Sequence, residues 1–350
     1  MPPALFLITP VVALLASSLV IAVIRYLDVL EREPWWTIGL SFLVGLVTVP
    51  VSIVLFGFTA DMWIALLGDE APLKAIQMVI DAPLVEEFVK GAAVFAVLLL
   101  IRHEIDSLTD FIVYACVVAV AFEFCENTLY LWTRLSQNEG SALAWMTEFN
   151  ARTIASAGMH AMFTSWVGFA LWCAMKLGSG SRRWLGALIG VSVAMLLHCM
   201  NNLGAYLSSV GDPYAITMLN QFGLSIGVLS KLLQMALFLA LMGSAILLDL
   251  HLIGDYGLAL QQRLKDYSPE QQLLGMSRLQ ALLNPFHHML SHANFTWRLT
   301  SLPDQSPVAR PEYSRFAKMA LHYGESSGDE RQRDLENGLS LLIPAGSNIN

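Results

Sequence analysis

Charged residues are scarce in this chain. Asp, Glu, Lys and Arg together make up only 14% of its 350 residues, against about a quarter in a typical soluble protein. Hydrophobic residues make up 55% of the chain, and the mean hydropathy is +0.57. The net charge of −8 comes mostly from loops and the C-terminal region, so no nucleic-acid partner is expected. The composition therefore excludes an ordinary soluble protein and predicts a protein whose partner is the lipid bilayer.

Cysteine and N-terminal basic residues are scarce too. The chain has four cysteines, all within apolar segments, so they are expected to be small hydrophobic side chains and not a disulfide framework. No Lys or Arg precedes Arg25, and no convincing cleavage site follows the first apolar stretch. A secretory signal peptide normally has a basic start, so the first stretch is expected to remain as a membrane span.

Long apolar stretches dominate the first 250 residues. About seven of them approach the roughly 20 residues that a helix needs to cross a bilayer, at residues 5–24, 36–58, 84–101, 108–132, 153–175, 184–206 and 223–248. Pro83 interrupts the third stretch, so residues 73–80 are predicted to form a surface helix and Asp81 to cap the span that follows. The sequence thus predicts an all-α, polytopic membrane helix bundle.

The composition changes sharply after residue 250, where polar and charged residues dominate. We therefore expect a transmembrane domain at residues 1–250, with its motifs at 81–206, and a soluble tail at 251–350. The tail should be partly helical, at 269–290, and partly disordered, at 301–311 and 325–337.

Basic residues are unevenly shared among the loops that join the spans. Loops on the cytoplasmic side of a membrane carry an excess of Lys and Arg. The loops after the first, third and fifth spans carry six such residues: Arg25, Arg32, Arg102, Lys176, Arg182 and Arg183. The loops after the second, fourth and sixth spans carry three: Lys74, Arg134 and Arg152. The bias predicts an outer N-terminus and a cytoplasmic tail.

Four of the predicted spans carry polar motifs. The third has Glu86-Glu87-x-x-Lys90, the fourth Glu123, Glu126, Asn127 and Tyr130, the fifth His160 and Thr164, and the sixth His198, Asn201 and Asn202. A charge at membrane depth costs about 2.5–3.5 kcal/mol, so such residues indicate function by default. Counted at ~1.5 Å per residue from the outer ends, Glu86, Glu126, His160 and His198 lie ~8, ~9, ~12 and ~12 Å deep. They are expected to meet at one level in the outer half of the bilayer.

Helical spacing assigns faces within the motifs. Glu86 and Glu87 are adjacent and point about 100° apart, so only one can face a shared cavity while the other makes a structural bond. Lys90 shares a face with Glu86 and can neutralise one of the two carboxylates. Glu123 is expected to be structural, through a bond to Asn127.

These motifs, in this order on successive apolar segments, resemble the PrsW intramembrane proteases, which are similar to the wider CAAX-protease and bacteriocin-processing superfamily. The resemblance covers about residues 81–205. It implies peptide-bond hydrolysis in a bacterial cytoplasmic membrane, on a single-span substrate such as an anti-sigma factor, cut near the extracytoplasmic face. Lys90 and Ser156 stand where the CAAX branch has Arg and an aromatic residue, so a prenylated substrate is not implied.

The resemblance also implies roles for individual residues. Glu86 and His160 would activate a water, while His198 and Asn202 would stabilise the oxyanion; both tasks suit these side chains. Glu87 and Glu126 complete the candidate catalytic set.

Two questions stay open at this level. Glu86, His160 and His198 could hold a zinc ion with an open position for water, or the site could work without metal through a glutamate base. An ion- or proton-coupled transporter and a non-catalytic membrane sensor are the alternatives to a protease. A proton relay would need polar steps at several depths, whereas the motif residues are expected at one level.

Overall fold

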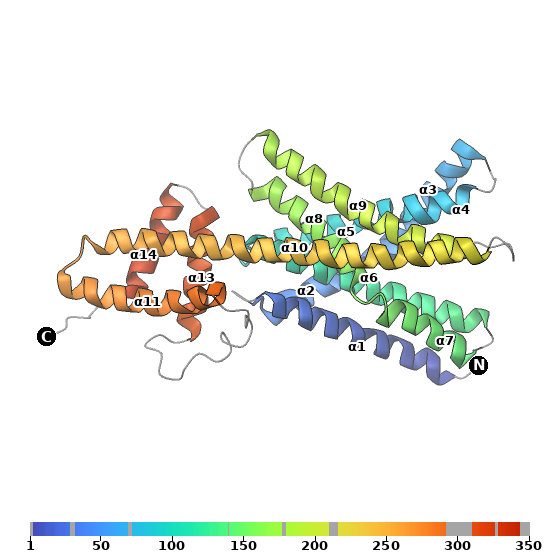
Figure 1. The fold of residues 1–350 in the computed structure, drawn as a ribbon, viewed down its shortest axis with the longest axis horizontal. Helices are drawn as coiled ribbons and strands as arrows, with labels where there is room; N and C mark the ends of the chain where they lie inside the picture. The colour runs from blue at the N-terminus through green and yellow to red at the C-terminus, as the bar shows by residue number, and fades with distance from the viewer. Residues whose placement is uncertain are drawn as a thin grey trace. The chain divides into compact units, whose positions relative to one another are not determined.

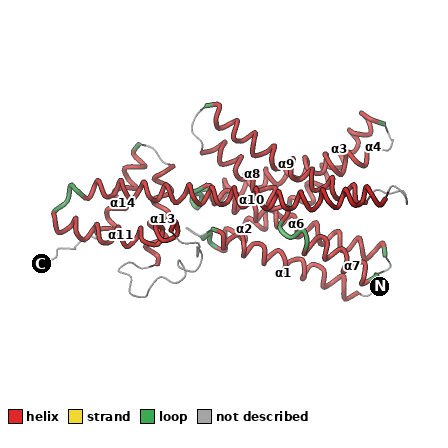
Figure 2. Tube along the Cα trace, viewed as in Figure 1, coloured by secondary structure: helices red, strands yellow, loops and turns green. Residues whose placement is uncertain are grey.

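The structure is a computed structural model that describes residues 3–28, 32–68, 72–138, 140–176, 180–209, 216–291, 310–325 and 328–343. Every regular element in these residues is a helix, and no strand occurs among them (Figure 1, Figure 2). The predicted all-α fold is thereby confirmed.

Six helical stretches among the described residues are long and apolar enough to cross a membrane. They match six of the seven predicted spans, as Ala4–Leu27, Trp35–Leu67, Leu108–Gln137, Ala142–Lys176, Ser181–Leu207 and Gly223–Leu264. The remaining predicted span, the third, at residues 84–101, corresponds to the 19-residue helix Ala82–Leu100, which carries Glu86, Glu87 and Lys90. The chain is therefore a multi-pass integral membrane protein.

The chain divides into two compact units. The first contains Met1–Arg25, Glu33–Arg102 and Phe111–Leu241, and the second contains Tyr26–Arg32, His103–Asp110 and Met242–Asn350. Helix α10, Ile216–Leu264, supplies residues to both and runs without a break past residue 250.

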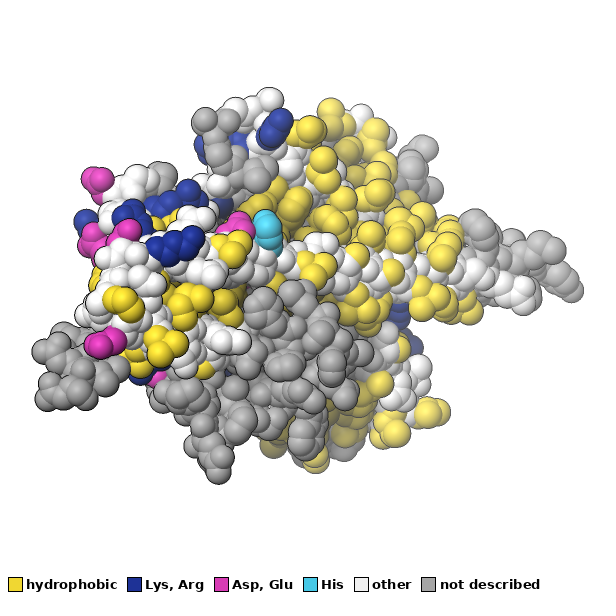
Figure 3. Space-filling model, turned by 60° about the vertical axis from the view of Figure 1, so that its left-hand side comes forward, with side chains coloured by type: hydrophobic (Ala, Val, Ile, Leu, Met, Phe, Trp, Pro, Cys, Tyr) yellow, Lys and Arg dark blue, Asp and Glu magenta, His cyan; other side chains and the backbone are white. Residues whose placement is uncertain are grey.

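Helix α6 forms the core of the first unit. All residues from Phe111 to Phe122 on it are buried. Helix α6 is Leu108–Gln137. The elements before it are α1 (Pro3–Leu27), α2 (Trp35–Leu46), α3 (Thr48–Leu67), α4 (Pro72–Ile76), η1 (Gln77–Asp81) and α5 (Ala82–Leu100), and those directly after it are α7 (Ala142–Phe149), η2 (Asn150–Ile154), α8 (Met159–Lys176) and α9 (Ser181–Ser209). Large hydrophobic side chains lie exposed on these outer helices, and Figure 3 shows them covering a broad area, as contact with lipid requires.

Glycines bring the site-bearing helices into backbone contact. A Cβ at Gly168 of α8 would lie 2.5 Å from the carbonyl oxygen of Phe111 in α6, and one at Gly190 of α9 would lie 2.7 Å from that of Trp166 in α8. Small residues allow such close approach between membrane helices. Helix α8 is thereby held against both α6 and α9, which fixes the relative position of the motifs on these three helices.

The predicted break at Pro83 is absent. Residues 72–100 are helical throughout, and the segment Gln77–Asp81 is a π-turn in which the amide of Ala82 bonds to the carbonyl of Gln77. The wider turn accommodates Pro83, which has no N–H to donate. Asp81 was expected to cap the span but makes no capping bond; its carboxylate accepts a 2.8 Å hydrogen bond from Thr59 Oγ1 instead.

The predicted fifth span also differs from the structure. Residues 150–154 form the π-turn η2, a turn follows, and α8 begins only at Met159, after Gly158 with a φ of +74°. His160 is therefore the second residue of α8 and not a residue deep inside a continuous helix. The depths counted for Glu86 and His160 started from helix ends that the structure does not have.

The described part of the second unit contains three helices besides the end of α10, namely α11 (Pro269–Ser291), α13 (Arg310–Glu325) and α14 (Asp329–Leu342). Helix α11 confirms the helix predicted at 269–290. The disorder predicted at 325–337 is wrong for the described residues, because α14 buries Leu335, Leu341 and Leu342, while its charged side chains other than the buried Asp334 stay exposed. Most of the predicted disordered segment 301–311 lies outside the described residues.

Candidate active site

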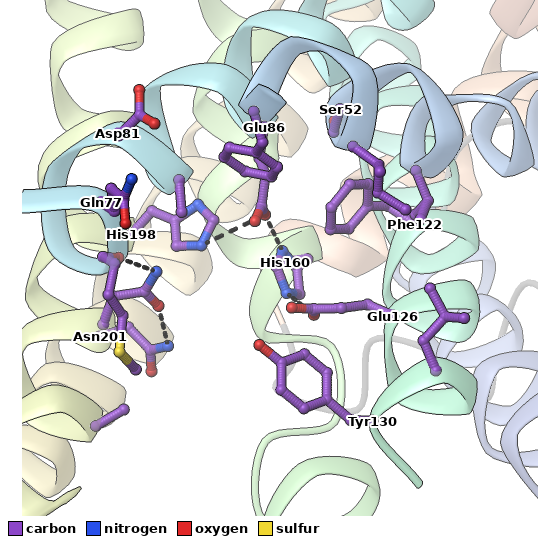
Figure 4. Close-up of a pocket in the computed structure, with 18 of the residues that line it drawn as sticks. Ser52, Gln77, Asp81, Glu86, Phe122, Glu126, Tyr130, His160, His198 and Asn201 are labelled. Carbon is purple, nitrogen blue, oxygen red and sulfur yellow. Dashed lines mark hydrogen bonds and ion pairs between the residues drawn. The ribbon is translucent and has the colours of Figure 1, made fainter. Parts of the chain in front are cut away.

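The charged and imidazole side chains of the motifs meet inside the first unit, and Figure 4 shows four of them, Glu86, Glu126, His160 and His198. They come from four helices that are distant in sequence, α5, α6, α8 and α9. Apart from the partly exposed Glu126, they are buried, with relative exposures of 8% or less for Glu86, Glu87, Lys90, His160 and His198. The motif residues of these four helices are thus brought together in one cluster.

Lys90 is the hub of this cluster. Its Nζ lies 2.8 Å from Glu87 Oε1, 3.4 Å from Glu86 Oε2 and 2.9 Å from His160 Nδ1, and it sits 4.2 Å from the centroid of the Phe122 ring. The side chain is completely buried, so these contacts replace its hydration. Lys90 therefore holds α5 against α6 and α8.

Glu87 makes the structural bonds of the pair. Its Oε1 accepts from Lys90 and, at 3.0 Å, from His198 Nδ1, while its Oε2 accepts from Thr164 Oγ1 at 2.8 Å. Glu87 is absent from the lining of the adjacent cavity, whereas Glu86 is part of it. This confirms that only one of the two adjacent carboxylates faces the cavity, and that one is Glu86.

Glu86 faces both imidazoles, as the dashed lines in Figure 4 show. Its Oε2 lies 3.7 Å from His198 Nε2 and 3.9 Å from His160 Nδ1. Both distances are too long for a direct hydrogen bond. The carboxylate oxygen of Glu86 is therefore close to two imidazoles without being bonded to either of them.

The partners of each imidazole define its tautomer. An ammonium can only donate, so Lys90 donates to His160 Nδ1, and His160 Nε2 donates to Glu126 Oε2 at 3.0 Å. His198 donates from Nδ1 to Glu87, which leaves its Nε2 lone pair on the side of Glu86. The two rings are perpendicular, with centroids 5.2 Å apart.

Glu123 fixes the start of α8. Its two carboxylate oxygens accept from the backbone amides of Gly158 at 2.9 Å and His160 at 3.3 Å. These are amides that a helix start leaves without an intrahelical acceptor. The predicted bond from Glu123 to Asn127 is wrong, since Asn127 Oδ1 instead accepts from Arg152 Nε at 3.2 Å. Glu123 is structural, as expected, but it acts on His160 from a neighbouring helix.

Arg152 is a site residue that the sequence did not single out. Its Nη2 lies 2.7 Å from Glu126 Oε2, and its guanidinium carbon lies 3.7 Å from the centroid of the Tyr130 ring. The sequence offered only a weak signal, namely an arginine at the edge of a predicted span and eight residues before His160.

Asn202 lies at the cavity but is engaged elsewhere. Its Nδ2 donates to the carbonyl oxygen of Met78 in η1 at 3.0 Å, and its Oδ1 accepts from Asn201 Nδ2 at 3.3 Å. The predicted oxyanion donor is thus present at the site and tied to the π-turn.

The cavity beside these residues has a volume of about 600 Å³. One wall is polar, with Glu86, Glu126, Arg152, His160 and His198 among its residues. Apolar side chains of α3 also line it. It is large enough for a short peptide segment, since ligand pockets commonly have volumes of about 300–1,000 Å³.

The sequence profile described as PrsW family intramembrane metalloprotease matches residues 33–240, which is more than half of the chain and includes every motif residue above. This chain belongs to the PrsW family. No curated protein and no solved structure matches it. Membership confirms the resemblance drawn from the motifs and makes this PrsW protein a membrane-embedded peptidase.

The metal in the family's description agrees with the donors of this PrsW site. Glu86, His160 and His198 each offer one ligand atom, and the three atoms lie within 4.8 Å of one another. Two imidazoles and one carboxylate are a ligand set of catalytic zinc sites. Glu86 and His198 present lone pairs to each other, whereas His160 would have to exchange the contact of one ring nitrogen.

Proposed function

We propose that this PrsW peptidase hydrolyses a peptide bond of a single-span membrane protein near the extracytoplasmic face of a bacterial cytoplasmic membrane. The observation that carries the proposal is Glu86, whose carboxylate faces two imidazoles and lines a cavity of about 600 Å³ within the helix bundle.

Hydrolysis requires a base that takes a proton from water as the water attacks the scissile carbonyl. Glu86 is suited to this task because Glu87, and not Glu86, makes the structural bonds to Thr164 and His198. In the proposed reaction, Glu86 takes the water proton and later gives it to the leaving nitrogen. A divalent metal, if held by Glu86, His160 and His198, would polarise the carbonyl and acidify the water.

The remaining polar residues hold these groups in place. Lys90 and Glu126 bond the two nitrogens of His160, and Glu123 holds the backbone at the start of α8. Such preorganisation matters because displacement of a reacting group by about 1 Å can cost about 100-fold in rate.

The position of the site along its helices supports cleavage towards the outer face. Glu126 lies eleven residues from the end of α6 at Gln137 and eighteen from its start at Leu108. His198 lies eleven residues from the end of α9 at Ser209 and seventeen from its start. Both are nearer the helix ends that the distribution of Lys and Arg assigns to the outside.

The cavity supports a membrane-protein substrate. Its apolar side on α3, which includes Val49, Ile53 and Phe56, suits hydrophobic side chains that flank a cleaved bond. A substrate resembling an anti-sigma factor, with a single span and an outer segment, has this character.

The experiment is a cleavage assay in proteoliposomes on a panel of single-span proteins with outer polar segments, with mass spectrometry of the products. Wild type is compared with Glu86→Gln and with the control Glu148→Gln, which changes a carboxylate of α7 that pairs with Arg134. Each variant is assayed with and without a strong chelator.

We expect Glu86→Gln to abolish cleavage and Glu148→Gln to retain it. Loss of wild-type cleavage on addition of chelator identifies a metal-dependent enzyme, and resistance to chelator identifies a glutamate base. Products cut in the inner half of the span would contradict the proposed face. Ion flux that requires Glu86, with no cleavage of any panel protein, would contradict the peptidase itself.

A further inference from the structure

Peptide hydrolysis places negative charge on the carbonyl oxygen, so the site needs hydrogen-bond donors aimed at that oxygen. The resemblance assigns this task to His198 and Asn202. In the structure, Asn202 Nδ2 donates to the carbonyl of Met78, and His198 Nδ1 donates to Glu87. The other ring nitrogen of His198, Nε2, lies 3.7 Å from the carboxylate of Glu86. Asn202 would have to exchange its partner before it could donate to a substrate, and His198 is directed at Glu87 and Glu86.

Arg152 offers donors without such an exchange. It lines the same cavity, and its side chain keeps 26% of its surface exposed. A guanidinium has five N–H groups. Among the described residues Arg152 makes one hydrogen bond, from Nε to Asn127, and one ion pair, from Nη2 to Glu126. N–H groups therefore remain for a ligand in the cavity.

The guanidinium is held in a fixed orientation. It stacks on the Tyr130 ring, while Glu126 and Asn127 bind its edge. The turn that follows η2 is fixed as well, because Lys231 of α10 donates to the carbonyl of Ala155 at 3.1 Å and to Ser156 Oγ at 3.0 Å. Donors that are fixed before the reaction need little rearrangement in the transition state.

Arg152 is also close to the proposed base. Glu126 Oε2 contacts both Arg152 and His160, and His160 Nδ1 lies 3.9 Å from Glu86 Oε2. One carboxylate and one imidazole thus separate the guanidinium from Glu86. Arg152, His160 and Glu86 also line the same cavity, so a water at Glu86 and a peptide carbonyl at Arg152 would occupy one space.

We propose that Arg152 is a further catalytic residue, which donates a hydrogen bond to the scissile carbonyl oxygen. When water adds to the carbonyl carbon, its proton passes to Glu86 and the π electrons of the C=O bond move to the oxygen, where Arg152 stabilises the negative charge. When the C–N bond breaks, the C=O bond re-forms and the leaving nitrogen takes the proton from Glu86. This inference rests on the proposed peptidase function.

The test measures kcat and KM on the panel protein that wild type cleaves fastest. Arg152→Met is compared with Arg134→Met, which removes an arginine whose Nε lies 3.8 Å from Glu148, away from the cavity. We expect Arg152→Met to lower kcat about 100-fold, with KM within about threefold of wild type, because removal of one oxyanion donor costs about 10²–10³ in kcat. A kcat within about threefold of the control would overturn the proposal.

A double-mutant cycle separates contact with substrate from an indirect effect through Glu126. If Arg152 touches the substrate, Arg152→Met still lowers kcat at least about 30-fold in the Glu126→Gln background. If adding Arg152→Met to the Glu126→Gln variant does not lower kcat further, Arg152 only positions Glu126, and the proposal is wrong.

Folding is followed by the heat-denaturation midpoint of each purified variant. If Arg152→Met does not fold, Arg152→Gln provides the same measurement, since it keeps an amide donor near Asn127 but loses the charge. The expected fall in kcat is then about 30- to 100-fold, and a kcat equal to wild type would overturn the proposal. Failure of this inference is distinguishable from failure of the proposed function, because Glu86→Gln still abolishes cleavage when only the role of Arg152 is wrong.

Discussion

Replacement of Lys90 by Met is the most informative perturbation of this PrsW protein. Methionine has a similar length and no charge, so the substitution removes the ammonium while filling most of its volume. The ammonium contacts Glu87 at 2.8 Å, Glu86 at 3.4 Å and His160 at 2.9 Å, and the side chain is completely buried. Lys90→Met would leave two adjacent, buried carboxylates without the cation that binds both.

The magnitude follows from the burial of the cluster. Removal of one partner of a buried ion pair costs about 3–5 kcal/mol, because the remaining charge is uncompensated. For a folded unit of about 150–250 residues, a range that includes the first unit, 1 kcal/mol corresponds to about 2–4 °C in the unfolding midpoint. We therefore expect Lys90→Met to unfold roughly 6–20 °C below wild type. The added substitution Glu87→Gln removes one uncompensated charge and should restore about half of the loss.

The assay heats detergent-solubilised protein at a fixed rate and measures the fraction that remains monodisperse by size-exclusion chromatography. A fixed rate is needed because unfolding of such proteins is commonly irreversible. Lys176→Met, at the exposed end of α8, is the control for loss of a lysine. A midpoint within about 2 °C of wild type, or a double variant no more stable than Lys90→Met, would refute the assignment of Lys90 as the hub.

Three further substitutions test separate parts of the structure. Glu123→Ala leaves the first amides of α8 without acceptors. We expect it to lower the free energy of unfolding by about 1–2 kcal/mol and to lower kcat at least about tenfold. An unchanged kcat would contradict the role of Glu123 in positioning His160. Gly168→Ala places a methyl group 2.5 Å from a carbonyl oxygen of α6, so its heat-denaturation midpoint should lie below that of Gly57→Ala, whose new methyl group meets nothing within 4 Å. Gly338→Ala drives a methyl group into the hydroxyl of Tyr256, so limited proteolysis should cut α14 faster than in wild type, and equal rates would argue against this packing.

The sequence predicted those features that depend on local spacing. Lys90 reaches both carboxylates because it stands three residues after Glu87 and four after Glu86, positions that share a helix face. The apolar runs predicted the membrane helices, because length and hydropathy alone decide that outcome. The order of the motifs indicated the family. It did not indicate which residue of each motif faces the cavity.

Features that depend on distant contacts were not predictable. The π-turn before Pro83 is tied to other helices by the bond of Asp81 with Thr59 and that of Asn202 with Met78. The start of α8 depends on a carboxylate 35 residues earlier in the chain. Arg152 was predicted only as a loop residue, because its contacts with Glu126, Asn127 and Tyr130 form when α6 packs beside η2.

The position of Lys90 also bears on the choice between a metal and a glutamate base. While its ammonium bonds His160 Nδ1, and Glu126 accepts from Nε2, His160 has no lone pair to offer. A metal held by His160 therefore requires Lys90 to withdraw to its carboxylate partners or the imidazole to turn away from Glu126. A glutamate base requires neither change, because Glu86 already faces the cavity and His198 Nε2 is already an acceptor for water. The metal route therefore requires the contacts of His160 with Lys90 and Glu126 to change, whereas the glutamate-base route keeps them. The chelator experiment thus distinguishes these two arrangements of His160 as well as the two chemistries.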